Sequence, residues 1–366
     1  MTRYLPFLLL FGALFTACED DETTDPTPVL EVPSTYNFEN VSYSGQTQRL
    51  GMLAELSSYL KSANDGSVAL DADRLQSMYA NEAGADWAGD YDDSKVLRSK
   101  TLESEQARFD ELLSAAAAAS QNPATAAPGT AGVASSADGA KNYLVSAGGV
   151  EYAQVIEKGL MGALVYYQAT GVYLEPGKLD VDNTDVEPGR GTAMQHHWDE
   201  SFGYLGVPTS FPADTDGLLF WGKYANDRDA LLGVNDRLMD GYLRGRAAIG
   251  TDDLDTRDEA ITTIRTAWDE VVAGTAIHYL NSAVAKYDDP ALRLHALSEA
   301  VAFIYSLRFS PARSVSPAQG DALLVDLGGS SDFLDMDLYA PTPAELIAVR
   351  DELATLSGLE STKTEL

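Results

Sequence analysis

The four histidines of the chain are the side chains best suited to metal coordination or proton transfer near neutral pH. Two of them are adjacent, and Glu200 follows His196 and His197 at four and three positions. Residues three or four apart share one face of an α-helix, so Glu200 can stand beside either imidazole. Imidazole nitrogens and carboxylate oxygens suit zinc, iron or manganese. The stretch MQHHWDESFGYLG therefore contains a candidate site, and Tyr204 continues its helical face.

A second histidine–glutamate pair lies on the strongly apolar stretch RLHALSEAVAFIYSLRF. In helical bundles, ligands of this kind project inward from facing helices. If the two pairs meet in one cavity, they supply up to four ligands for a divalent metal such as iron or zinc. The predicted ligands are His197, Glu200, His295 and Glu299. His196 then serves as a fifth ligand or as a hydrogen-bond donor behind the others.

A structural role is the alternative for each pair. The histidine then forms a surface ion pair with its glutamate, or it is buried and the carboxylate satisfies it. We expect this structural role for His278. Glu157 and Gln168 are the polar exceptions in residues 141–173, which form the most apolar stretch after the amino terminus. With Tyr204, they are further candidates for lining the site.

The sequence contains no familiar hydrolase motif. A zinc peptidase of the common type carries His-Glu-x-x-His, and many serine hydrolases carry Gly-x-Ser-x-Gly, but neither occurs here. The single cysteine, Cys18, lies at the amino terminus. We therefore favour a binding protein that holds a metal ion or a small ligand without catalysis. A metal-dependent peptidase and a structural or surface-interaction protein stay open as alternatives.

Hydrophobic periodicity indicates a mainly α fold, in which antiparallel helical bundles are joined by irregular loops. Apolar residues recur every three or four positions, as in Leu50, Leu53, Leu56 and Leu60, and no convincing run of alternating strand residues occurs. The expected helices cover roughly 46–60, 71–80, 94–120, 141–173, 190–205, 214–247, 256–287, 290–308 and 341–357.

Residues 121–140 interrupt this pattern with Ala, Gly, Ser, Thr and Pro. Such a composition is typical of a flexible loop. The loop is either an exposed insertion without function or a gate over a ligand site.

Composition limits the classes of function. The chain has 366 residues and a net charge of −31, because 56 acidic residues outnumber 25 basic ones. A field this negative repels phosphate backbones, so we expect no nucleic-acid partner. The hydrophobic fraction of 45% is enough for a large core and excludes global disorder.

The amino terminus has the features of an export signal. Arg3 precedes the apolar stretch LPFLLLFGALF, and small Ala17 comes directly before Cys18. The run Phe15-Thr16-Ala17-Cys18 resembles the bacterial lipoprotein signal. That resemblance implies a signal peptide over residues 1–17 and a lipid-carrying Cys18 that holds the protein in a membrane. Residues 18–35 are acidic and rich in Thr and Pro, which predicts an extended tether. The acidic run beside the lipid resembles that of outer-surface lipoproteins of some Gram-negative bacteria, and this resemblance implies the outer membrane, on the periplasmic side or at the cell surface.

The body of the chain resembles the imelysin-like superfamily, and specifically an uncharacterised branch of bacterial lipoproteins related to imelysin. The resemblance runs from about residue 36 to 366 and is carried by VSYSGQTQRL, EKGLMGALVYYQATGVYL, HHWDESFGYLG and LHALSEAVAFIYSLRF. The superfamily motif Gly-x-His-x-x-Glu maps its histidine to His197 and its glutamate to Glu200, with Gln195 at the glycine position.

This resemblance implies a helical fold with an internal duplication, whose halves would cover 36–205 and 206–366. It places the motif at a pocket between the halves. It also implies an exported or lipid-anchored protein associated with iron uptake, in a superfamily of which some members are classed as metallopeptidases.

Overall fold

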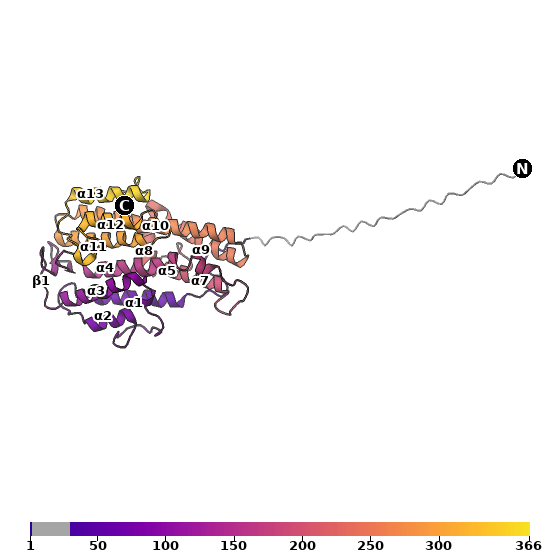
Figure 1. The fold of residues 1–366 in the computed structure, drawn as a ribbon, viewed down its shortest axis with the longest axis horizontal. Coiled ribbons are helices and arrows are strands. Elements are labelled where there is room, and N and C mark those ends of the chain that lie inside the picture. Colours follow the sequence, from indigo (N-terminus) through magenta and orange to yellow (C-terminus); the bar gives the residue numbers. More distant parts are fainter. Residues whose placement is uncertain (2–29) are drawn as a thin grey trace.

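The computed structural model describes Met1 and residues 30–366, and in these residues the fold is mainly α (Figure 1). The predicted fold class is therefore confirmed. The predicted signal peptide, the lipidation site at Cys18 and most of the acidic tether lie outside the described residues, Met1 excepted. None of the described helices combines the length and the hydrophobicity that a membrane span requires.

The first part of the fold runs to Gly203 and contains three of the helices that position the candidate residues. Its elements are α1 (Ser44–Lys61), α2 (Ala72–Ala80), the 3-10 turn η1 (Arg98–Lys100), α3 (Glu103–Ala119), α4 (Tyr152–Leu160), the π-helix η2 (Met161–Tyr166), α5 (Tyr167–Gly171), α6 (Pro176–Leu179) and α7 (Ala193–Gly203).

The second part contains the longest helix. Its elements are α8 (Phe220–Leu232), α9 (Val234–Gly250), α10 (Leu254–Ala285), α11 (Pro290–Ser306), the 3-10 turns η3 (Leu307–Phe309) and η4 (Phe333–Asp335), α12 (Pro317–Gly328) and α13 (Pro343–Ser357). Short turns join α9, α10 and α11, and these helices pack side by side, so neighbours run antiparallel.

Local chemistry sets the ends of these helices. The α11 helix begins where Asp289 accepts hydrogen bonds from two backbone N–H groups, with Pro290 in the first turn. The expected helix over 214–247 is instead two helices, because Gly233 has φ 58° and ends α8. The α12 helix was not predicted, although Ser316 and Gln319 form a capping box at its start.

The segment predicted as a flexible loop, residues 121–140, contributes two strands to a small sheet. Strand β1 (Ala124–Thr125) pairs in parallel with β2 (Gly132–Ser135), which pairs antiparallel with β3 (Asn142–Val145). A Cβ on Gly132 would lie 2.0 Å from the carbonyl oxygen of Ala124, so only glycine allows the two strands this close. Composition predicts a flexible loop here and does not reveal this backbone pairing between short strands.

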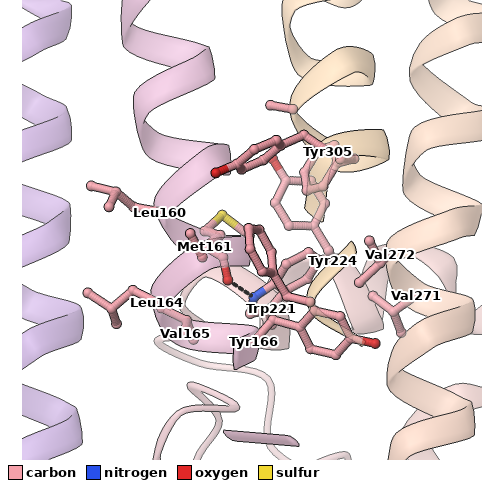
Figure 2. Packing of buried hydrophobic residues seen from close by; sticks show 14 of the residues in the cluster. Leu160, Met161, Leu164, Val165, Tyr166, Trp221, Tyr224, Val271, Val272 and Tyr305 are labelled. Carbon is pink, nitrogen blue, oxygen red and sulfur yellow. Dashed lines mark hydrogen bonds between the residues drawn. The ribbon is translucent and has the colours of Figure 1, made fainter. Parts of the chain in front are cut away.

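The predicted central helix over 141–173 is present from Tyr152 but contains a π-helical turn (Figure 2). The indole N–H of Trp221 donates a hydrogen bond of 2.9 Å to the carbonyl oxygen of Met161 in that turn. A Cβ on Gly162 would lie 2.2 Å from Ser306 Oγ, so this glycine lets α11 approach closely. Tyr166 and Trp221 are both fully buried there.

One hydrophobic core cluster extends from Tyr36 to Leu366 across the described chain. The α4 helix of the expected first half packs directly against α11 of the expected second half. The core therefore gives no boundary between halves, and the internal duplication stays a prediction.

Candidate functional site

A cavity of about 560 Å³, here called the main hollow, lies between α1, α4, α8, α10 and α11. Lys61, Lys158 and Lys223 all line it. They are three of only nine lysines in a chain with a net charge of −31. The lining therefore has more lysines than carboxylates, which are Glu157 and Glu299, in contrast to the acidic chain as a whole.

A buried cluster of charges forms one wall of the hollow. Glu157 accepts hydrogen bonds from Lys61, Lys158 and the hydroxyl of Ser57. Burial alone would raise the pKa of Glu157, but Lys158 and Lys61 outweigh that effect and lower it. Burial would lower the pKa of Lys158, but Glu157 and Glu299 raise it. Glu157 and Lys158 are therefore both charged at neutral pH.

His295 lies at another wall, between two carboxylates. Its Nδ1–H donates to Oε2 of Glu151 over 2.6 Å, and its Nε2 is 3.5 Å from Oε1 of Glu299. Tyr143 of β3 stacks on the imidazole, with 4.5 Å between ring centroids. Burial would lower the pKa of His295, but the hydrogen bond to Glu151 and the charge of Glu299 raise it. The structure therefore favours the charged imidazolium at this position.

Two buried acceptors of the hollow have no hydrogen-bond partner. Oε1 of Gln154 and Oε2 of Glu299 are both inaccessible to water and unpaired. The two residues are only 5% and 4% exposed. Leaving a buried acceptor unpaired costs about 1–3 kcal/mol, and more when the group is charged. A turn of either side chain toward the hollow would pair its acceptor with a donor group of a bound ligand.

The first predicted pair occupies a different place. Nδ1 of His197 donates to Oε2 of Glu200 over 2.9 Å, and Gln46 of α1 donates to Oε1 of the same carboxylate over 3.0 Å. His196 is farther away, with its Nε2 at 3.8 Å. Burial would raise the pKa of Glu200, but these partners lower it to about 2. A smaller hollow of about 350 Å³ lies beside His196 and His197.

The two histidine–glutamate pairs do not meet. Glu200 bonds to Gln46 near the start of α1, whereas the hollow with His295 and Glu299 lies around Ser57 and Lys61 near its end. Eleven residues of helix separate Gln46 from Ser57, which is about 16 Å at 1.5 Å per residue. Figure 1 likewise shows α7 at one end of the bundle and the sheet, which carries the Tyr143 stacked on His295, at the other.

The structure thus does not bring the four predicted metal ligands together. The helical spacing within each pair was correctly inferred, but α7 and α11 lie at different heights along the bundle. Among the residues that the structure describes, no group of three or more His, Cys, Asp or Glu residues is arranged to hold a metal ion.

The remaining candidates have structural surroundings. Gln168 donates to the backbone oxygen of Lys100, and Tyr204 is fully buried with an unpaired hydroxyl. The imidazole Nδ1 of His278 lies 2.9 Å from the backbone oxygen of Leu366, which agrees with the structural role expected for it.

The comparisons with known proteins concern nearly the whole described chain. A family model described as a domain of unknown function (DUF4856) matches residues 33–359. The chain belongs to the DUF4856 family. No curated protein and no solved structure matches it. The prediction of an uncharacterised family is thus confirmed, whereas the relationship to imelysin stays a prediction.

Sequence reasoning missed most of the residues that form the main hollow of this DUF4856 protein. Gln154, Glu157 and Lys158 recur at spacings of three and four and place three polar groups on one face of α4. Ser57 and Lys61 do the same on α1. An adjacent acid and base inside the apolar run YAQVIEKGLMGALVYY was the available signal, because buried charges need partners.

Proposed function

We propose that this DUF4856 protein is a lipid-anchored exported binding protein that holds a small polar ligand in the hollow between α1, α4, α8, α10 and α11. The observation that carries the proposal is the presence of two unpaired, buried acceptors, on Gln154 and Glu299, in the wall of that hollow. Buried polar groups in folded proteins are nearly always paired. A bound ligand with donor groups removes this cost.

The size and lining of the hollow support the same function. Binding sites for small molecules have volumes of roughly 300–1,000 Å³ and combine apolar walls with a few placed polar groups. Here Phe220, Tyr224 and Tyr279 supply aromatic surface beside the Lys61–Glu157–Lys158 cluster. Charged groups in a hollow whose pKa values are shifted by burial and by charged neighbours are also typical of functional sites.

The ligand we propose is organic, although the sequence analysis allowed a metal ion as well. Both ring nitrogens of His295 face carboxylates, one of Glu151 and one of Glu299. These contacts leave neither nitrogen free to coordinate a metal. Iron uptake stays an expectation from the resemblance to imelysin, and no contact of the described residues favours it.

The membrane anchor in this proposal comes from the sequence. Cys18 follows an apolar export signal, and two or more acyl chains on it would make membrane attachment effectively permanent. The acidic tether up to residue 35 would separate the helical body from the membrane surface. Radiolabelled fatty acid should be incorporated into the wild-type protein in a bacterial host and should be lost with Cys18→Ser.

A thermal-shift screen tests the binding function. The mature protein is screened against metal ions, sugars, amines, carboxylates, amino acids and short peptides. Ala54 lines the hollow on α1, so Ala54→Phe is expected to fill part of it and abolish the shift. Ala115→Phe on α3, outside the hollow, is the matched control. The proposal fails if no compound stabilises the wild type more than it stabilises Ala54→Phe.

A further inference from the structure

The arrangement of donors and acceptors in the main hollow selects one class of ligand. The unpaired acceptors, Oε1 of Gln154 and Oε2 of Glu299, are buried in α4 and α11. One is an amide oxygen and the other a carboxylate oxygen, and both are hydrogen-bond acceptors. A ligand group that satisfies them must donate hydrogen bonds, and an ammonium group has enough donors for both.

The exposed part of the hollow has the opposite character. Lys223 on α8 is exposed and forms no salt bridge among the residues that the structure describes. The side chain of Lys61 is 41% exposed, and its ammonium group has donors beyond the one given to Glu157. These two lysines present positive charge where the hollow opens to water, so an anionic group is favoured there.

Aromatic side chains lie between these two regions. Tyr224 and Tyr279 line the hollow with ring centroids 6.5 Å apart, and Lys158 already places its ammonium 5.4 Å from the Tyr224 ring. Burial and the neighbouring Tyr224 and Glu299 raise the pKa of Tyr279, so its hydroxyl stays protonated. Aromatic faces attract cations and also bury apolar carbon atoms.

We infer that the ligand is a small zwitterion of the amino-acid or short-peptide class, with its ammonium group at Glu299 and Gln154 and its carboxylate at Lys61 and Lys223. The inference rests on the binding function proposed above. A volume of about 560 Å³ accommodates a molecule of this size. A plain amine leaves Lys223 without an anionic partner, and a plain carboxylate leaves the two buried acceptors unpaired.

Matched compound sets test the inference. Isothermal titration calorimetry and thermal shift are run on the mature protein with the twenty standard amino acids and a dipeptide library. Each zwitterion is compared with its amine lacking the carboxylate and with its acid lacking the amino group. At least one zwitterion should bind about 10- to 100-fold more tightly than both analogues, because each loses one charged hydrogen-bonding group.

Two variants locate the groups. Glu299→Gln should weaken binding of the zwitterion about tenfold or more and should reduce its advantage over the acid. Lys223→Gln should weaken binding of the zwitterion and reduce the difference in affinity between the zwitterion and the amine. Because this position is exposed, the substitution does not endanger folding. Lys141→Gln, at an exposed lysine outside the hollow, is the matched control and should bind as the wild type does.

The outcomes separate this inference from the binding function. If sugars, simple amines or other classes bind in an Ala54-dependent manner and zwitterions do not, the inference is wrong and the binding function stands. If an analogue binds as tightly as its zwitterion, one charged end is not recognised and the inference is also wrong. If nothing binds, both fail.

Discussion

Replacing Glu157 by Gln should be strongly destabilising, because it leaves two ammonium groups without their shared carboxylate. Lys158 is the more affected group, since its side chain is only 6% exposed. Breaking a buried ion pair by removing one partner costs about 3–5 kcal/mol. Glutamine keeps the volume and can still accept from Ser57, so the change isolates the charge.

The expected shift in melting temperature follows from the size of the protein. An unfolding entropy of about 2.1 cal/mol/K per residue gives roughly 0.7 kcal/mol/K for the described part of the chain. A loss of 3–5 kcal/mol therefore lowers the melting temperature by about 4–7 °C. Differential scanning calorimetry at pH 7 measures this shift.

A second substitution tests the physical reason. Glu157→Gln combined with Lys158→Met also removes the unpaired buried ammonium group, and Lys61 can turn to water. The double variant should therefore be about 2 kcal/mol or more stable against unfolding than Glu157→Gln alone. Glu187→Gln is the control, because it removes an exposed ion pair with Arg190 and should cost less than about 1 kcal/mol. The reasoning is refuted if Glu157→Gln melts within about 1 °C of the wild type, or if the double variant is less stable than the single one.

Three further predictions concern other parts of the fold. The pKa of Glu200 is lowered from 4.5 to about 2, so its ionised form should add at most about 3 kcal/mol to the free energy of unfolding above pH 4.5, and this should be lost as the pH falls toward 2. Urea unfolding of wild type and Glu200→Gln at a series of acidic pH values measures this loss, and an equal dependence of stability on pH in the two proteins would contradict it. Because the pKa of His295 is raised, the stability added by its charged form is present below pH 6.5 and is lost as the pH rises through the raised pKa. Urea unfolding from pH 5 to 9 should show this loss in the wild type and not in His295→Gln. Gly132→Ala should separate β1 from β2 and speed proteolysis within 121–140 about tenfold. Gly177 has open space around it, so Gly177→Ala is the control and should leave the cleavage rate unchanged. An unchanged cleavage rate in Gly132→Ala would argue against the strand pairing.

The sequence was most informative where a single helix contains the whole signal. Leu50, Leu53, Leu56 and Leu60 are all buried along α1, as their spacing predicts. Asp289 and Pro290 begin α11 where the sequence places a stop and a restart. Within each pair, the helical spacing of histidine and glutamate also gives real contacts, of 2.9 Å for His197 and 3.5 Å for His295.

The sheet shows a different limit of sequence reasoning. Its strands have two to four residues, too few for a recognisable alternation of polar and apolar side chains. Their pairing depends on backbone hydrogen bonds, to which Ala, Gly and Ser contribute as well as any other residue. Composition therefore predicted a flexible loop where the structure has order.

The amino-acid sequence by itself determined the mainly α class, the start of α11 and the buried face of α1, because these follow from contacts between residues a few positions apart. Only the tertiary structure decided which polar groups share a hollow. It separated His197 from His295 and joined Lys61, Glu157 and Glu299 from three helices. Hydrophobic periodicity fixes how a helix is rotated about its axis, but the packing of all helices fixes its neighbours and its height along the bundle.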